Sequence, residues 1–174
     1  MYRILSSLAV AVALSGAQAS AQELADMSDL EYAHIAYTAD VIDIRYAHLA
    51  LAISDNPAIH EFANTMIRDH TAVNAAALGL LEKLGATAQD NGFSQTLNAN
   101  AEKIIDNLSQ LRGAEFDKAY AENELAYHQA VNELVEDTMI PNIDNAEVKA
   151  LFEQGLEIFK AHEGHAEVMV ESLN

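Results

Sequence analysis

Long stretches of helical periodicity, interrupted at few positions, are the feature that most restricts the fold of this chain. Its 174 residues include only two prolines, Pro57 and Pro141, and both stand at the edges of apolar helical patterns. Proline is tolerated in the first turn of a helix and otherwise ends it. No run of alternating β-branched residues occurs, and the single Asn-Gly pair lies in a polar segment. The sequence therefore predicts an all-α fold.

Periodicity and breakers together predict five helical stretches, at about residues 27–53, 57–84, 93–111, 114–139 and 145–172. The short link at Ser54–Asn56 makes the first two helices an antiparallel pair. The polar residues 86–92 are expected to form a loop, and the shorter helix after them makes the second connection long enough for a crossover. Four long amphipathic helices plus a short linker helix predict a ferritin-like four-helix bundle. We expect residues 22–174 to form this single domain.

The first 21 residues have the pattern of a secretory signal peptide. Arg3 supplies the positive charge, an apolar stretch covers Ile4–Leu14, and Ala19-Ser20-Ala21 fits a cleavage site. The apolar stretch is too short for a membrane-spanning helix, so a membrane anchor or a cytosolic start is the less favoured interpretation. Without cysteine the chain has no lipidated cysteine, disulfide or thiolate. We expect a periplasmic protein that is not inserted in the membrane after cleavage.

The chain is strongly acidic, with a formal net charge of −18. Removing Met1–Ala21, which carries Arg3 and no acidic residue, changes that charge to −19. Such acidity argues against binding to nucleic acid or to anionic membrane surfaces and is compatible with loose attraction of cations. Hydrophobic residues make up 51% of the chain, so a packed core is feasible. A metal ion is the expected partner, and self-association remains open.

Several ligand-type side chains fall on the apolar faces of the predicted helices. His70 lies in the stripe of its helix, and His162 lies in the stripe of the last helix with Glu163 and His165 at its edges. Glu124 and His128 are four residues apart and can face one point. The first helix has two apolar faces, one around Asp43 and one at positions 41, 44, 48 and 51, so its orientation stays open. An imidazole directed at a core needs a partner there, because an unpaired buried polar group is costly.

These residues suggest a metal site in the bundle core, since bundles build such sites from carboxylates and histidines on facing helices. The candidate ligands are Asp43, His70, Glu124, His128, His162 and His165. Nitrogen and oxygen donors suit iron, manganese, zinc or copper(II). Met66 and Met169, each one turn from a histidine, would favour copper, although methionine at helical spacing usually fills a core.

Two observations keep other interpretations open. The Glu-x-x-His pairs of di-iron bundles are not intact, because Ile67, Leu125 and Phe159 precede the histidines by three residues. A two-metal oxidase or a peroxide-consuming enzyme is therefore the weakest hypothesis, and a non-enzymatic protein is favoured. The alternative to a metal site is a buried hydrogen-bonded network of histidines and carboxylates that fixes helix register. An envelope-stress interaction protein would need nothing more.

Motifs spread over nearly all of the mature chain give it a family resemblance. The matching positions are Asp43, Ala50, Pro57, Ile59, Phe62-Ala63, Met66, Asp69-His70-Thr71, Gly113, Phe116-Asp117, Tyr120, His128, His162 and Ala166. In this spacing the chain resembles the exported bacterial family called domain of unknown function 4142. The resemblance implies a ferritin-like fold and an exported location, and members of the family are often labelled outer membrane proteins.

The resemblance also bears on the candidate site. It implies that Asp43 stands where the family usually has Glu, and that His70, His128 and His162 are the histidines of the family. Glu124 and His165 are then particular to this chain. We expect metal storage, buffering or stress protection. We also expect Asp69 or Asp117 to orient an imidazole by bonding to the ring nitrogen that does not bind the metal.

Overall fold

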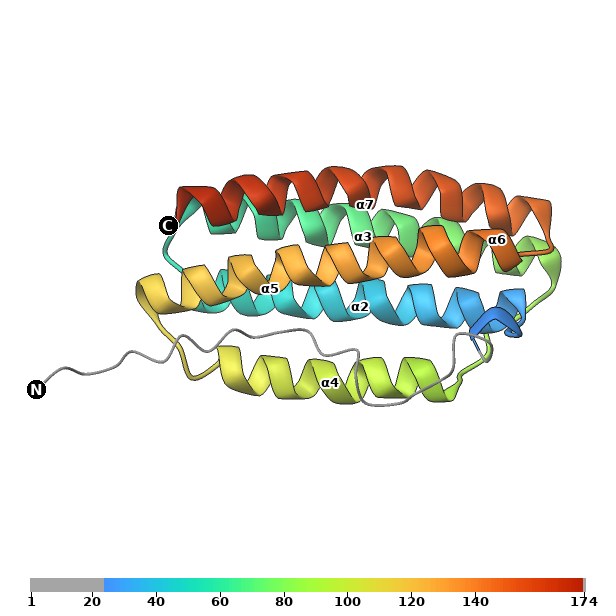
Figure 1. Cartoon of the computed structure of the whole chain (residues 1–174), viewed down its shortest axis with the longest axis horizontal. Helices are drawn as coiled ribbons and strands as arrows, with labels where there is room; N and C mark the ends of the chain where they lie inside the picture. Colours follow the sequence, from blue (N-terminus) through green and yellow to red (C-terminus); the bar gives the residue numbers. More distant parts are fainter. Residues whose placement is uncertain (1–23, 174) are drawn as a thin grey trace, which may run out of the picture.

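The computed structural model describes residues 24–173, which form five long helices (Figure 1). They are α2 (Asp29–Ile53), α3 (Pro57–Leu84), α4 (Gly92–Leu108), α5 (Gly113–Leu134) and α7 (Ala146–Ser172). Between α5 and α7 lie a π-helical turn, η1 (Val135–Met139), and the short α6 (Ile140–Asn142). No strand occurs between residues 24 and 173, so the all-α prediction is confirmed for that part of the chain.

Local capping signals explain where the long helices begin and end. Ser28 caps α2 in a capping box with Glu31, and the Asn56 side chain accepts from Ala58 N–H where Pro57 opens α3. Gly85, with a φ of 63°, ends α3 in the left-handed conformation that glycine adopts without strain. Asn145 accepts from the first backbone N–H groups of α7. These ends agree with those predicted from the sequence to within a few residues.

The end of α5 differs from the prediction, which placed a single helix up to residue 139. Regular α-helix stops at Leu134, and the Ile140 N–H bonds to the Val135 carbonyl, five residues back. This wider turn is a π-helix, and Pro141 follows inside α6 instead of ending the helix. Proline has no N–H to donate to the carbonyl four residues back, so a locally altered hydrogen-bond pattern beside it is expected.

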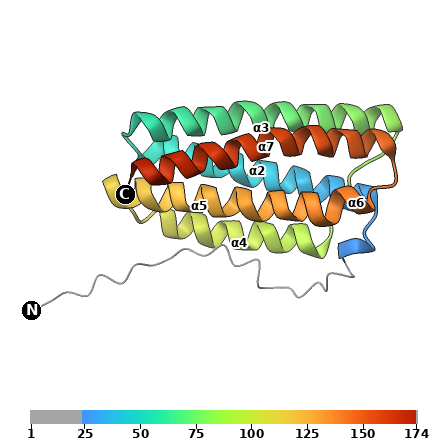
Figure 2. The ribbon, with the colours of Figure 1, turned by 45° about the horizontal axis from the view of Figure 1, so that its top comes forward.

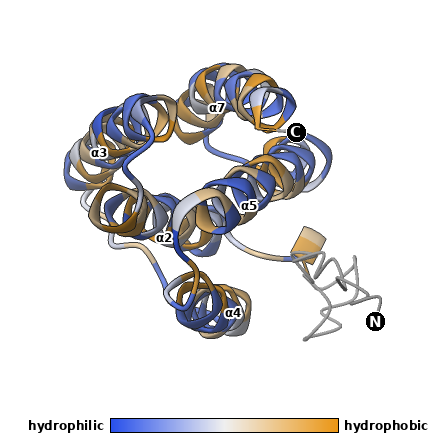
Figure 3. Cartoon of the chain, turned by 90° about the vertical axis from the view of Figure 1, so that its left-hand side faces the viewer, coloured by the Kyte–Doolittle hydropathy of each residue, from blue (hydrophilic) through white to orange (hydrophobic). Residues whose placement is uncertain are grey.

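Four of the long helices surround a common interior, and α4 lies outside them (Figures 2 and 3). Around the bundle α2 packs on α3, α3 on α7, α7 on α5 and α5 on α2. The chain direction reverses between each of these neighbours, because α4 runs back along the bundle before α5 begins (Figure 1). α4 packs mainly on α2 and also touches α5.

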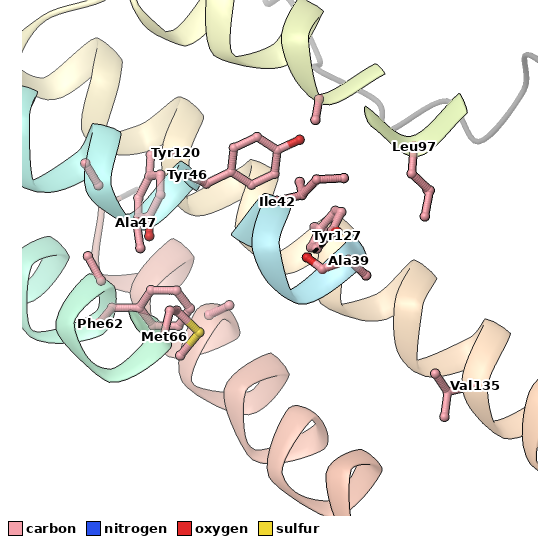
Figure 4. Close-up of a cluster of buried hydrophobic side chains, with 14 of the residues drawn as sticks. Ala39, Ile42, Tyr46, Ala47, Phe62, Met66, Leu97, Tyr120, Tyr127 and Val135 are labelled. Carbon is pink, nitrogen blue, oxygen red and sulfur yellow. Dashed lines mark hydrogen bonds between the residues drawn. The ribbon is translucent and has the colours of Figure 1, made fainter. Parts of the chain in front are cut away.

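The position of α4 explains why periodicity alone left α2 without an orientation. α2 contacts α3, α5 and α4, so apolar residues are needed on more than one of its faces. The face around Asp43 is the one that is buried, with Ala39, Ala47 and Ala50. The aromatic core lies beside it: the Tyr46 and Tyr127 rings meet edge to face at 5.6 Å, and Phe62 meets Tyr120 at 6.3 Å (Figure 4).

The predicted signal peptide, Met1–Ala21, lies outside the described residues, so the structure does not test where the mature domain begins. Among the helices between residues 24 and 173, none combines the length and apolar character that a membrane crossing requires.

Candidate metal centre

Four helices each direct at least one titratable side chain into the bundle interior. α2 contributes Asp43, α3 contributes His70, α5 contributes Glu124 with His128, and α7 contributes His162. Asp43 and Glu124 are 0% exposed, and none of the three histidines is more than 4% exposed. Polar groups buried this completely are expected to have specific partners.

His70 lies between two carboxylates of α2. Its Nδ1–H donates to Oδ1 of Asp40 at 2.7 Å, and its Nε2 is in contact with Oδ2 of Asp43. The Phe159 ring is stacked on the imidazole, with ring centroids 4.8 Å apart and planes 10° from parallel. The ring of His70 is therefore fixed in both position and rotation.

The other two histidines are each held through one ring nitrogen. Nδ1–H of His128 donates to the backbone carbonyl of Glu124 at 2.9 Å. Nε2–H of His162 donates to Oδ2 of Asp69 at 3.1 Å. Such bonds fix the tautomer, so that the second nitrogen of each ring carries a free lone pair.

The free nitrogens of the three rings face a common point. One ligand atom from each of His70, His128 and His162 lies within 4.8 Å of the others. The ring centroids are 5.3–5.8 Å apart. Nε2 of His128 and Nδ1 of His162 are buried without a hydrogen-bond partner, and Nε2 of His70 contacts Oδ2 of Asp43. Three nitrogens placed in this way could hold a metal ion.

Two carboxylates adjoin this group. Oδ2 of Asp43 lies 3.7 Å from Nε2 of His128, and Oε2 of Glu124 lies 3.9 Å from Nδ1 of the same ring. All four carboxyl oxygens are buried; Oδ2 of Asp43 contacts Nε2 of His70, and neither oxygen of Glu124 makes a hydrogen bond of good geometry. Unsatisfied buried oxygens are expensive in a core and are the donor atoms that a metal would use.

Burial and the charges in the core set the protonation of these groups. Burial opposes a charge on His70, but attraction to Asp43 and the hydrogen bond to Asp40 outweigh it and raise its pKa to about 10. Burial alone would raise the pKa of Asp43, yet His70 holds it below its usual range. Burial, with the nearby charge of Asp43, raises the pKa of Glu124 well above normal. At neutral pH His70 and Asp43 therefore form an ion pair, and the surroundings of Glu124 favour its protonated form.

The remaining two histidines are neutral at that pH. Burial lowers the pKa of His128, and it lowers the pKa of His162 to about 4 although Asp69 opposes the change. Neutral imidazole is the form that binds a metal ion.

The structure separates the predicted site residues into two groups. It brings together Asp43, His70, Glu124, His128 and His162. His165 is exposed and lines a surface groove of about 430 Å³ between α3 and α7. It therefore does not join the buried group.

Of the two acids expected to orient a histidine, Asp69 is hydrogen-bonded to His162, whereas Asp117 is bonded elsewhere. Asp117 accepts a hydrogen bond from Ser54 Oγ at 2.5 Å, where α2 ends. The sequence reasoning missed Asp40, which orients His70. A signal was present, since Asp40 precedes Asp43 by three residues and so shares its helix face.

Fold and site together define a class: an all-α protein whose packed helices carry three buried histidines that could hold a metal ion. The chain belongs to the family described as a domain of unknown function (DUF4142), which it matches over residues 13–169. Comparisons with curated proteins and with solved structures gave no match.

Proposed function

We propose that this protein is a periplasmic, ferritin-like bundle that binds a transition metal in its core and serves in metal storage, buffering or stress protection. His70, His128 and His162 are the ligands in this proposal, Asp43 is a fourth, and Glu124 is an additional oxygen donor. The ion would be iron, manganese, zinc or copper, all of which accept nitrogen and oxygen donors. Export rests on the N-terminal sequence pattern, and the mature domain begins after Ala21.

One observation carries the proposal. His128 and His162 each have one nitrogen tied to a protein oxygen, the Glu124 carbonyl or Asp69, while the other nitrogen is buried without a hydrogen bond, and the second nitrogen of His70 faces only Asp43, itself a proposed ligand. Metal-binding histidines show this division, because the outer hydrogen bond orients the ring and leaves a lone pair for the metal. A purely structural network would satisfy both nitrogens.

The two carboxyl groups offer oxygen donors beside the imidazoles. His70 holds Asp43 in its charged form, and Oε2 of Glu124 lies 3.9 Å from Nδ1 of His128. A cation bound at Nε2 of His70 would displace the proton from that nitrogen. A bound ion would act as a Lewis acid or as a redox centre. The residues themselves orient the imidazoles and, through Phe159 stacked on His70, keep one side of the group apolar.

Metal content before and after reconstitution tests this function. Protein purified without a histidine tag is equilibrated with Fe²⁺, Mn²⁺, Zn²⁺ or Cu²⁺, desalted, and analysed for metal and for thermal stability. We expect one equivalent of at least one metal, and a rise in melting temperature that depends on metal concentration.

Matched variants show where the metal is bound. His70→Gln and His128→Gln should lose both effects, whereas His165→Gln, which changes an exposed histidine of α7, should keep them. Absence of stoichiometric metal in the wild type, or equal loss in His165→Gln, would contradict the proposal.

A further inference from the structure

A pocket of about 50 Å³ lies in the bundle close to the His70 side chain. Its walls come from α2, α3, η1 and α7. Asp40, which bonds to Nδ1 of His70, and Phe159, which is stacked on the ring, are both part of these walls. The pocket therefore adjoins the Nδ1 side of the imidazole, whereas Nε2 contacts Asp43. We call it the apolar pocket.

The lining of the apolar pocket suits an uncharged, apolar molecule better than water or a cation. Among the described residues that line it, only Asp40 has a polar side chain. Oδ1 of Asp40 already accepts from His70, and the charges of these two residues balance each other. A buried water typically makes about three hydrogen bonds, whereas apolar cavities stay dry and admit apolar molecules.

A glycine in the interior of α7 leaves the apolar pocket unfilled. Gly155 is buried and lines the pocket, although glycine is less favourable than alanine inside a helix. A Cβ at this position would lie 3.6 Å from Phe159 and 4.0 Å from Val73, which are ordinary contact distances. Within the described residues, no close approach of another helix requires this glycine. Empty space in a core forfeits dispersion contacts, which a small occupant would restore.

A smaller, mostly apolar pocket of about 30 Å³ adjoins the first one between α2, α4 and α5. Ala36 and Val135 line both pockets. Val135 is also the first residue of the π-helical turn, and such turns are frequent at functional sites. The apolar space therefore extends from the residues that hold His70 toward α4.

We propose that the apolar pocket binds an uncharged diatomic gas, dioxygen or nitric oxide, beside the imidazole of His70. A space of roughly 10–15 Å³ already holds one water-sized molecule, so a pocket of about 50 Å³ has room for a diatomic gas. Such a gas has no charge to desolvate and gains contacts with the apolar walls. The inference goes beyond metal binding and does not depend on it, because the pocket is present in the metal-free chain.

Xenon, which is inert and enters apolar cavities, is the first probe. Metal-free protein with labelled alanine, isoleucine and valine methyl groups is titrated with xenon under pressure and followed by nuclear magnetic resonance. Gly155→Ala places a methyl group in the pocket, and Ala77→Val adds volume from α3 as a second filling variant. Gly164→Ala is the matched control: it also lies inside α7, but it does not line the pocket, and its Cβ would meet no described atom within 4 Å.

In the wild type we expect saturable xenon shifts at the methyl groups of Val73, Ala77 and Val148, which line the pocket. Gly155→Ala should bind xenon about tenfold more weakly, because the added methyl group occupies part of the space. Gly164→Ala should bind it as the wild type does. Both variants should melt at a higher temperature than the wild type, since each removes a glycine from a helix interior. Xenon shifts that do not saturate, or equal binding by the filling and control variants, would overturn the inference.

The two gases are then compared directly. Dioxygen and nitric oxide are paramagnetic, so either one increases the relaxation of nearby methyl groups, with dinitrogen as the diamagnetic reference. Excess relaxation at Val73 and Ala77 over Ile59, a fully buried residue that does not line the pocket, identifies which gas binds. No excess with either gas would refute the proposal. Metal content enters none of these measurements, so a failure of the proposed metal site leaves their outcome unchanged.

Discussion

Replacing Glu124 with methionine should make the metal-free protein more stable. Both carboxyl oxygens of Glu124 are buried without a good hydrogen bond, and the residue is 0% exposed. An unsatisfied buried polar group costs about 1–3 kcal/mol of folding free energy. Methionine follows the same unbranched path with one heavy atom fewer and has a similar helix propensity, so overpacking is small. Asp43 keeps its contact with His70 in the variant.

The expected gain is large enough to measure. In a chain of this length each kcal/mol corresponds to roughly 2–4 °C in melting temperature, which gives a rise of roughly 2–12 °C for Glu124→Met. Urea unfolding of chelator-treated protein at pH 7 measures the same gain as a free energy. If the site binds a metal as proposed, its donor groups lower the stability of the empty fold.

In the metal-loaded state the wild type should be more stable than Glu124→Met. A metal at a hundredfold excess over its dissociation constant stabilises the folded state by about 2.7 kcal/mol. Glu124→Met should gain less than the wild type, because it has lost an oxygen donor. Glu122→Met is the control: Glu122 lies on the same helix, its side chain is 40% exposed, and the change should stay within about 0.5 kcal/mol. A metal-free Glu124→Met protein less stable than the wild type would refute the reasoning and favour a structural network.

Three further predictions follow from the same contacts. The free energy of unfolding of the metal-free protein should fall as pH rises from 6.5 toward about 10. The folded state raises the pKa of His70, and the stability gained from the protonated imidazole is lost as its proton leaves. Urea titrations between these pH values measure the free energy of unfolding, and a value independent of pH would contradict the prediction. Asp40→Asn should weaken metal binding about 10–100-fold in competition titrations, since it loosens the orientation of His70, and an unchanged affinity would exclude that role. Tyr127→Phe should cost about 0.5–1.5 kcal/mol, because its hydroxyl donates to the Ala39 carbonyl at 3.0 Å. Tyr120→Phe should cost nothing, because the Tyr120 hydroxyl has no partner, and equal losses in calorimetry would rule this out.

Helix positions were predictable because their signals are local. Pro57 opens α3 and Gly85 ends it, as expected from residues that act on their own backbone. The apolar stripe containing His70 was also predictable from the sequence, since residues three and four apart share a helix face. The π-helical turn before Pro141 was not predictable, because nothing in its composition distinguishes it from a continuing α-helix.

The candidate site was predictable only as a set of inward-facing side chains. Periodicity placed His162 in a stripe and left His165 on its edge, and only the packing of α7 against α3 and α5 shows that His165 is exposed. Asp40 was overlooked because α2 is apolar on more than one face. The covering helix that explains this pattern, α4, is remote in the sequence.

By itself the sequence determined the all-α class, the ends of most helices and the presence of histidines on apolar faces. Those properties depend on backbone interactions within a few residues. Only the tertiary structure decided that His70, His128 and His162 meet, and which nitrogen of each ring is tied to an oxygen. The physical reason is that the three rings meet only where their helices pack together. Two of the rings are held by residues far away in the sequence: Asp40 lies 30 positions from His70, and Asp69 lies 93 positions from His162.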